Sequence, residues 1–275
     1  MISKNQIKFI RQLEQKKFRH REGLFVAEGT KVVGDLLKAG YIPHSLYATP
    51  DWLAENVPLL SRRGQGWSDQ ATEVTTDELT RLSFQQHPQQ VLALFPIPNI
   101  LPLSRGSQRG SDQALAQTTP NPSYSGGELS LALDGVQDPG NLGTIIRIAD
   151  WFGISNIICS EDTVDAWNPK VVQATMGSIA RVNIIYSNLP QWLDSLPSDF
   201  PVYGTLLDGE NIYTQELTPY GLIVMGNEGN GISDAVRQRV NRRLLIPDFH
   251  NGDTADSLNV AIATAITCSE FRRRQ

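Results

Sequence analysis

Three short segments in the second half of the chain combine glycines with polar side chains that could hold a ligand. The first covers residues 138–147, in which Asn141 falls at the expected mouth of a helix and Arg147 lies inside that helix, between two isoleucines. A charged residue on a helix that packs against a sheet needs a partner. Arg147 therefore either forms a structural salt bridge or uses its planar guanidinium to clamp a phosphate or carboxylate.

The second segment, residues 221–233, starts as a short apolar run that is typical of a strand buried on both faces. It then breaks into Gly226, Gly229 and Gly231, with the carboxylate of Glu228 among them. Glycine lets a backbone approach a ligand closely, and the start of the following helix offers free N–H groups. The spacing Gly-x-x-Gly-x-Gly differs from that of dinucleotide-binding folds. The segment is either a tight turn or one wall of another kind of site.

The third segment joins Ile246-Pro247 to the run Asp256-Ser257-Leu258-Asn259-Val260. Ser257 has the side chain of a helix N-cap, and capping alone would explain it. Asn259 is an amide within an otherwise apolar run. His250 and Asp253 precede Ser257, but no nucleophile elbow surrounds that serine, which argues against a Ser-His-Asp hydrolase.

Alternating strands and helices must position these three segments. The predicted strands are 129–134, 156–159, 182–186, 202–207, 221–225 and 244–247, and the predicted helices are 142–152, 168–179, 190–196 and 257–272. This alternation predicts an α/β fold with a mainly parallel sheet that helices cover on both faces. Because ligands bind at the carboxyl ends of the strands in such sheets, we expect the site in the loops that follow the strands.

The first part of the chain shows a second, smaller alternation of helices and strands. A helix is expected over residues 3–20, and Thr75 with Glu78 forms a capping box for a short helix. Residues 98–128 are rich in Pro, Ser, Gln, Gly, Asn and Thr, and such a segment buries too little apolar surface to offset its ordering entropy. The predicted organisation is a small α/β domain over 1–97, a flexible linker over 98–128 and a larger α/β domain over 129–275.

Positive charge is concentrated at the start of a chain whose net charge is −5. Residues 1–31 carry eight lysines and arginines against three glutamates, a local charge of +5. Such a patch on an acidic protein can bind a polyanion, although a charged helix face is often simply solvated. The candidate polyanion-binding residues are Lys4, Lys8, Arg11, Lys16, Lys17 and Arg19.

The remaining composition argues against several other classes of protein. No uninterrupted apolar stretch reaches the ~18 residues of a membrane span, and no long apolar region follows the basic start as in a secretory signal. Cys159 and Cys268 lie far apart in apolar contexts, which favours buried reduced thiols over a disulfide or a metal site. We therefore expect a cytoplasmic protein that has no metal and no membrane partner.

Taken together, the three segments resemble the motifs of the SpoU/TrmH family of RNA ribose methyltransferases. The matching runs are Asn141-x-Gly143-x-x-x-Arg147-x-Ala149, then Ile223-Val-Met-Gly226-Asn227-Glu228-Gly229-x-Gly231-Ile-Ser233, then Ile246-Pro247 with Ser257-Leu258-Asn259-Val260-Ala261. Their order and their spread over residues 129–275 also fit the family. The early run Val26-Ala-Glu28-Gly29 resembles the RNA-binding domain that often precedes the catalytic domain.

The resemblance implies a fold and a cofactor that the residue patterns alone do not show. It implies a C-terminal trefoil knot of the SPOUT type, a homodimer formed through that domain, and S-adenosylmethionine as methyl donor. Backbone groups would hold the adenine, and apolar side chains such as Leu258 would flank it. The implied cofactor-binding residues are Thr205, Leu206, Leu207, Gly226, Asn227, Gly229, Ile246, Ser257, Leu258 and Asn259. The loop 248–254 is longer than is usual in the family.

The implied reaction is methyl transfer to a ribose 2′-hydroxyl of ribosomal or transfer RNA, with ribosomal RNA favoured. Arg147 would bind the adjacent phosphate and stabilise the developing alkoxide, since guanidinium is almost never deprotonated. The residues expected to orient the ribose and Arg147 are Asn141, Glu228, Ser257 and Asn259. The alternative is an RNA-binding protein that has lost catalysis. A nicotinamide dehydrogenase is disfavoured because Gly-x-Gly-x-x-Gly does not follow an early strand.

Overall fold

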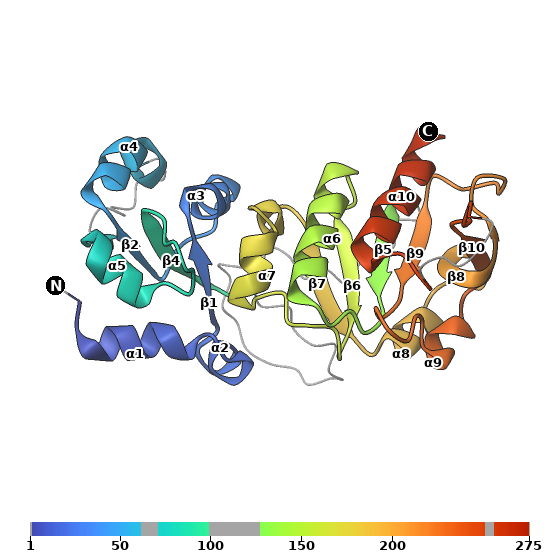
Figure 1. The fold of residues 1–275 in the computed structure, drawn as a ribbon, viewed down its shortest axis with the longest axis horizontal. Coiled ribbons are helices and arrows are strands. Elements are labelled where there is room, and N and C mark those ends of the chain that lie inside the picture. Colours follow the sequence, from blue (N-terminus) through green and yellow to red (C-terminus); the bar gives the residue numbers. More distant parts are fainter. Residues whose placement is uncertain (1, 62–70, 99–126, 251–255, 275) are drawn as a thin grey trace, which may run out of the picture.

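The computed structural model describes residues 2–61, 71–98, 127–250 and 256–274, which form two α/β units side by side (Figure 1). The first unit contains α1 (Lys4–Gln12), α2 (Lys16–Glu22), β1 (Leu24–Glu28), α3 (Thr30–Ala39), β2 (Ser45–Ala48), α4 (Pro50–Ser61), β3 (Ala71–Glu73), α5 (Thr76–Leu82) and β4 (Val91–Pro96). Its sheet has the order β1-β4-β2-β3, in which β4 runs antiparallel to β1 and β2. The predicted capping box is confirmed, because the side chains and backbones of Thr75 and Glu78 bond reciprocally.

The second unit is built around one six-stranded sheet in which every neighbouring pair is parallel, with the order β10-β8-β9-β5-β6-β7. Its strands are β5 (Leu129–Leu133), β6 (Asn156–Ser160), β7 (Asn183–Ser187), β8 (Val202–Asn211), β9 (Gly221–Met225) and β10 (Arg242–Leu245). Its helices are α6 (Pro139–Trp151), α7 (Pro169–Ala174), the 3₁₀ helix η2 (Ser178–Ala180), α8 (Leu189–Asp194), α9 (Asp234–Arg237) and α10 (Val260–Arg273). The predicted mainly parallel α/β fold is confirmed.

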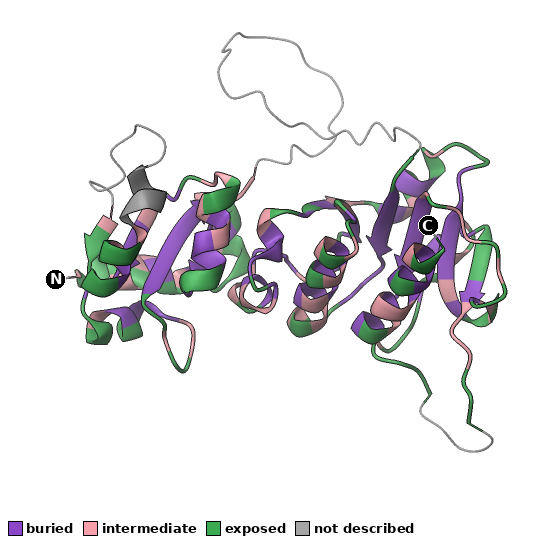
Figure 2. Ribbon diagram, turned by 90° about the horizontal axis from the view of Figure 1, so that it is seen from above, coloured by how far each residue is buried: buried purple, intermediate pink, exposed green. Residues whose placement is uncertain are grey.

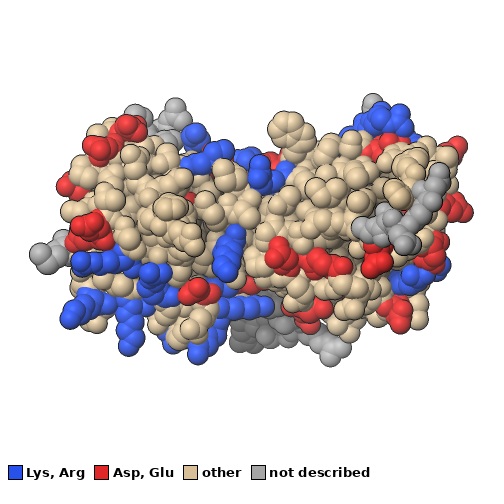
Figure 3. Space-filling view, viewed as in Figure 1, with Lys and Arg blue, Asp and Glu red and all other residues tan. Residues whose placement is uncertain are grey.

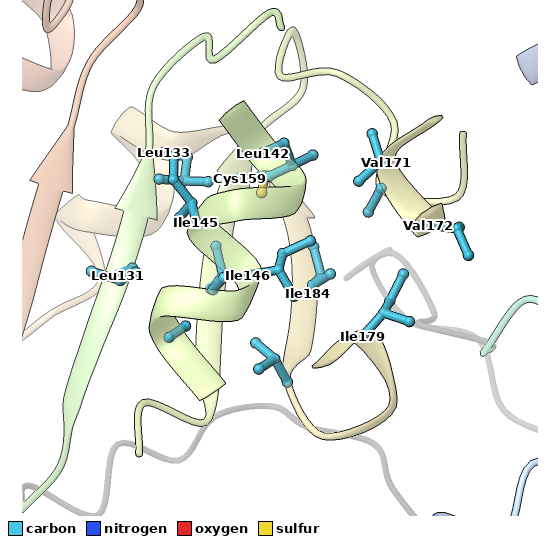
Figure 4. Close-up of a cluster of buried hydrophobic side chains, with 14 of the residues drawn as sticks. Leu131, Leu133, Leu142, Ile145, Ile146, Cys159, Val171, Val172, Ile179 and Ile184 are labelled. Atoms are coloured by element: carbon cyan, nitrogen blue, oxygen red, sulfur yellow. The ribbon is translucent and has the colours of Figure 1, made fainter. Parts of the chain in front are cut away.

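Helices cover both faces of the parallel sheet. Successive residues of a strand point to opposite sides, so each strand contributes side chains to both faces. Leu131 and Leu133 of β5 pack toward Ile145 and Ile146 of α6 (Figure 4), whereas Ala132 between them belongs to a second cluster under α8 and α9. The central strands β5 and β9 are buried along their whole length, and the helices beside the sheet have exposed outer faces (Figure 2). This two-sided burial explains why these two strands read as uninterrupted apolar runs in the sequence.

Two predicted helices are interrupted in the structure. The helix expected over 3–20 divides into α1 and α2, because the guanidinium of Arg19 donates to the carbonyls of Leu13 and Glu14, at 2.8 and 2.6 Å, and so caps the end of α1. The helix expected over 168–179 ends at Ala174. Met176 and Gly177 follow in the left-handed region, with φ of 51° and 94°, a conformation that terminates a helix.

The apolar cores of the two units are continuous. One cluster of buried side chains runs from Phe25 and Val33 of the first unit to Val171 and Ile179 of the second. The ring of Trp167 lies 4.7 Å from that of Phe25, and α7 packs against β1. The boundaries 1–97 and 129–275 stay a prediction, and the linker predicted over 98–128 lies outside the described residues except at its two ends.

Both cysteines are buried and unpaired, and burial raises the pKa of each thiol, that of Cys268 to about 12. Within the described ranges, no helix is both long and apolar enough to cross a membrane. The same residues contain no group of three His, Cys, Asp or Glu side chains that could hold a metal ion.

Candidate active site

Three side chains from the three segments form a continuous hydrogen-bonded chain. The Nδ2 of Asn259 donates to the Oδ1 of Asn141 at 2.9 Å, and the Nδ2 of Asn141 donates to the Oε1 of Glu228 at 3.0 Å. Asn141 thus uses its amide oxygen toward one segment and its amide nitrogen toward the other. Because both ends of the amide are engaged, the orientation of Asn141 is fixed.

Glu228 accepts two further hydrogen bonds, from the backbone N–H groups of Gln137 at 3.1 Å and Asp138 at 3.2 Å. Partial burial acts to raise the pKa of Glu228, but the bonds from Asn141 and from these backbone groups outweigh it and lower that pKa. Glu228 is therefore an ionised acceptor that joins the glycine-rich loop to the start of α6, and it is a poor proton acceptor near neutral pH.

Two helix caps place the asparagines of this network. Asp138 is the N-cap of α6, and its Oδ1 accepts from the N–H of Asn141 at 2.8 Å, which fixes Asn141 in the first turn. Asn259 is the N-cap of α10, and its Oδ1 accepts from the N–H groups of Ala261 and Ile262. The cap of the terminal helix is therefore Asn259 and not Ser257, because Asn259 uses its oxygen for capping and its nitrogen for Asn141.

The glycine-rich loop is closed by its own hydrogen bonds. The backbones of Asn227 and Gly231 bond to each other in both directions, and the Asn227 side chain donates to the carbonyl of Gly135 at 2.6 Å. A Cβ on Gly226 would lie 2.2 Å from the carbonyl carbon of Gly231, so only glycine fits there. Position 226 thus requires glycine because two backbone segments pass close to each other there. The loop is also a tight turn, as one of the two interpretations of the sequence expected.

Arg147 lies on the exposed side of α6 and makes no hydrogen bond or ion pair with any residue that the structure describes. The structural salt bridge considered for this residue is therefore not formed within the described chain. Glu228, which the motifs suggested as a partner of Arg147 or of the ribose, bonds instead to Asn141 and to the backbone. The guanidinium remains available to an anion from outside the chain.

A cavity of about 630 Å³ lies beside the network, a volume in the range of small-ligand sites. The residues implied for the cofactor that line it are Thr205, Leu206, Leu207, Gly226, Asn227, Gly229, Ile246, Ser257 and Leu258. Asn259, also implied for the cofactor, is not among the lining residues, and Glu228 is. The structure thus brings the end of β9, the middle of β8 and the approach to α10 around one space.

Several other residues line the cavity that were not among those implied for the cofactor. They include Asp208, Met225, Arg237, Leu244, Leu245, Asp256, Val260 and Ala263. The apolar ones lie at the ends of β9 and β10 or at the start of α10. The rule that ligands bind at the carboxyl ends of parallel strands would have pointed to Met225 and Leu245.

Comparison with known proteins decides the family. The family model described as SpoU rRNA Methylase matches residues 128–269, and the model described as MRM3-like substrate binding domain matches residues 4–93. The chain belongs to the SpoU rRNA methylase family. The resemblance inferred from the three motifs is thereby confirmed, and the Asn141–Glu228–Asn259 network lies within the region that the SpoU model matches.

Relatives of this SpoU protein match it over nearly its whole length. The 23S rRNA (guanosine(2553)-2′-O)-methyltransferase RlmP of Bacillus subtilis is 30% identical over 98% of this chain and 97% of its own. A structure described as a putative RNA methyltransferase of the TrmH family from Porphyromonas gingivalis is 39% identical, with a TM-score of 0.80 and full coverage of both chains. An AdoMet-bound rRNA methyltransferase from Sinorhizobium meliloti is 31% identical, with a TM-score of 0.77 over 100% of this chain and 96% of its own.

Proposed function

We propose that this protein transfers a methyl group from S-adenosylmethionine to a ribose 2′-hydroxyl of RNA, with ribosomal RNA as the substrate. The observation that carries the proposal is the Asn259–Asn141–Glu228 network, which joins the three family motifs beside a cavity of about 630 Å³. The relatives described above are RNA 2′-O-methyltransferases or rRNA methyltransferases by name. The alternative of an RNA-binding protein without catalysis is disfavoured, because every catalytic residue that the motifs indicate is present.

The cavity suits S-adenosylmethionine in size and in chemistry. Its exposed apolar side chains Leu207 and Leu258 offer surfaces for an adenine ring, and the backbone of the 226–231 loop offers polar groups close to the space. Thr205 and Ser257 add hydroxyl groups to the lining. S-adenosylmethionine would supply an electrophilic methyl group on a sulfonium, so its leaving group departs neutral.

Within this proposal, Arg147 binds the phosphate next to the target ribose and stabilises the developing alkoxide. Two facts support the role: the guanidinium has no partner among the described residues, and α6 also carries Asn141 of the network. Arg147 is not the base, since guanidinium stays protonated in proteins. Its planar fork can bind a phosphate through two parallel hydrogen bonds.

Asn141, Asn259 and Ser257 are proposed to orient the ribose. Glu228 is proposed to hold Asn141 in place rather than to accept the proton, because hydrogen bonds already occupy its carboxylate and lower its pKa. Holding the reacting groups in one geometry supplies much of the acceleration available to such a transfer.

The RNA would reach this site from the N-terminal unit. Lysine and arginine side chains gather over α1 and α2, along the lower edge of that unit in Figure 3. The exposed members are Lys4, Lys8, Arg11, Lys16 and Lys17. The prediction that Arg19 also belongs to this exposed set is wrong, because its guanidinium is buried against Asp165 and does not reach the surface. Phosphate contacts of this kind position a nucleic acid without reading its sequence.

The proposal includes a homodimer through the C-terminal unit and a knotted path of its chain, in the cytoplasm. Helices α6 and α10 pack side by side (Figure 1), and their outer faces carry Trp151 at 85% and Ile262 at 52% exposure. A second copy would cover these apolar groups. The insertion of β9 between β5 and β8 in the sheet is compatible with a knot, and two buried reduced thiols fit the cytoplasm.

Two measurements test this function. Titration calorimetry with S-adenosylmethionine separates the enzyme from a catalytically inactive RNA binder, because only the enzyme requires that cofactor. Transfer of a labelled methyl group to ribosomal RNA and, in parallel, to transfer RNA then tests the substrate. Failure to bind S-adenosylmethionine would refute the enzyme, and methylation of transfer RNA alone would refute the ribosomal assignment.

A further inference from the structure

A buried ion pair joins the two units of the molecule. Arg19 of α2 is 1% exposed, and both its Nε and its Nη2 donate to the Oδ2 of Asp165, the Nε at 2.9 Å. Its Nη1 donates to the carbonyls of Leu13 and Glu14. The side chain of this one residue of α2 therefore bonds both to the end of α1 and to the second unit, which carries the candidate active site.

The acceptor side of this pair is held as firmly as the donor side. The Oδ1 of Asp165 accepts from the N–H of Trp167 at 3.2 Å. The hydroxyl of Tyr186 accepts from the N–H of Ala166 at 2.8 Å and donates to the carbonyl of Val164 at 2.5 Å. The segment 164–167 is thus fixed on the edge strand β7, and Trp167 packs against Phe25 of the first unit.

The same loop also supports the candidate active site. The side chain of Gln137 donates to the carbonyl of Asp162 at 2.6 Å, and the N–H of Val164 donates to the carbonyl of Val136 at 2.9 Å. Gln137 in turn donates its backbone N–H to Glu228. Hydrogen bonds and the backbone of the 162–165 loop therefore connect Arg19 to Glu228 and Asn141.

A fully satisfied buried ion pair adds little to stability compared with apolar residues of the same size, but losing one partner is costly. In some proteins such a pair instead fixes one geometry among several. Here the geometry is the orientation of α1 and α2, which carry the exposed cations, relative to the loop that supports Glu228. A small tilt at the interface would move a distant ribose out of line with Arg147, and misplacement by about 1 Å can cost roughly 10²-fold in rate.

We propose that Arg19 and Asp165 are positioning residues for methyl transfer, which lock the RNA-binding unit in one orientation relative to the Asn141–Glu228–Asn259 network. The catalytic effect of this pair rests on the proposed function. The rigid coupling of the two units does not depend on that function. The other polar contacts named across this interface are more exposed: Gln85 bonds to Gln173, and Arg181, at 45% exposure, bonds to Asp35.

Calorimetry of the full chain tests the coupling without using activity. The wild-type protein is expected to unfold in one transition, because the two cores are continuous. Arg19→Met and Asp165→Asn are expected to split it into two. The matched control is Arg239→Met, which removes an equally charged side chain paired with Asp194 inside the catalytic unit and should keep one transition. A single transition in both interface variants, or two in the control, overturns the coupling.

Kinetics at saturating RNA and cofactor test the positioning role. Each interface variant should lower kcat by about tenfold or more, while its affinities for S-adenosylmethionine and RNA stay within about twofold of wild type. The double variant should lose no more than the worse single variant, because both act through one pair. Arg19→Lys keeps the positive charge but lacks the planar fork, so its kcat should fall as well. This variant replaces Arg19→Met in the test if Arg19→Met does not fold.

Two results would overturn the positioning role. Wild-type kcat in folded Arg19→Lys and Asp165→Asn would refute it directly. A loss confined to RNA affinity in the Arg19 variants, with a shallower salt dependence and a normal Asp165→Asn, would make Arg19 a phosphate contact instead. If the wild-type protein methylates no RNA, the proposed function fails, and the calorimetric result alone still decides the coupling.

Discussion

At the scale of single residues, the site combines side chains that are already bonded within the protein with one cation that is not. Asn141, Glu228 and Asn259 use their polar atoms on one another and on the backbone. Arg147 has no such partner among the described residues. In the proposed mechanism, the first three act as a preorganised frame, and Arg147 is the group left to meet the negative charge of the substrate.

Arg147→Lys tests this division of roles. Lysine keeps the positive charge but cannot form the bidentate fork on a phosphate, so methyl transfer should fall by about 10²-fold. Binding of S-adenosylmethionine, measured by titration calorimetry, should stay unchanged because Arg147 does not line the cavity. Near-normal transfer rates with intact cofactor binding would exclude the clamp role.

Glu228→Gln tests the ionised acceptor through its pH dependence. The pKa of Glu228 is below its ordinary value of 4.5, so the ionised carboxylate stabilises the fold above pH 4.5, and that contribution disappears as the pH falls through the lowered pKa. The variant should lose about 1 kcal/mol of unfolding free energy at neutral pH, and the difference from wild type should shrink in acid. Denaturant unfolding across this pH range measures it; a difference that does not change with pH would contradict the account.

At the scale of the elements, the beginning of α10 has two separable tasks, because Asn259 caps the helix with its oxygen and orients Asn141 with its nitrogen. Asn259→Asp keeps a good cap and removes the donor, so it should retain stability but lose most methyl transfer. Asn259→Ala should lose both, with about 1 kcal/mol of stability. Thermal unfolding and a methyl-transfer assay on the pair separate the tasks. Equal stability in the two variants would show that the cap contributes nothing.

The strands and most helices could be predicted because their signals are local. A strand buried on both faces, such as β5 or β9, reads as an apolar run wherever it lies in the fold. The ends of α1 and α7 could not be predicted in the same way. The guanidinium that caps α1 also binds Asp165 of the other unit, and the chain turns at Gly177, where a Cβ would lie 2.4 Å from a carboxylate oxygen of Asp35.

In the candidate site as well, the sequence predicted the local features but not the contacts between distant segments. The residue types and spacings of the motifs identified Asn141, Glu228 and Asn259, but not which atoms meet, because the order of the hydrogen bonds depends on how three distant loops fold together. For the same reason the burial of Arg19 was not visible in a helix that otherwise reads as a basic surface. Charge alone does not say which side of a short helix faces a neighbouring unit.

At the scale of the whole molecule, the proposed homodimer would bury the outer faces of α6 and α10. Trp151 lies four residues after Arg147 and on the same side of α6. Trp151→Glu would place a charge in the proposed interface and should weaken self-association by about tenfold or more. Sedimentation velocity at several concentrations measures this. Tyr213→Glu, at an exposed aromatic residue that lies outside α6 and α10, is the control and should leave self-association unchanged. A wild-type monomer would refute the interface.

The most direct test of the central claim is the chemical position of the methyl group. Purified protein, S-adenosylmethionine and unmethylated ribosomal RNA are incubated, and the product is digested to nucleosides and mapped by mass spectrometry. We expect one 2′-O-methylated ribose in ribosomal RNA, formed by the wild-type chain and nearly lost in Arg147→Lys. A methyl group on a base, or none on RNA despite bound S-adenosylmethionine, would contradict it.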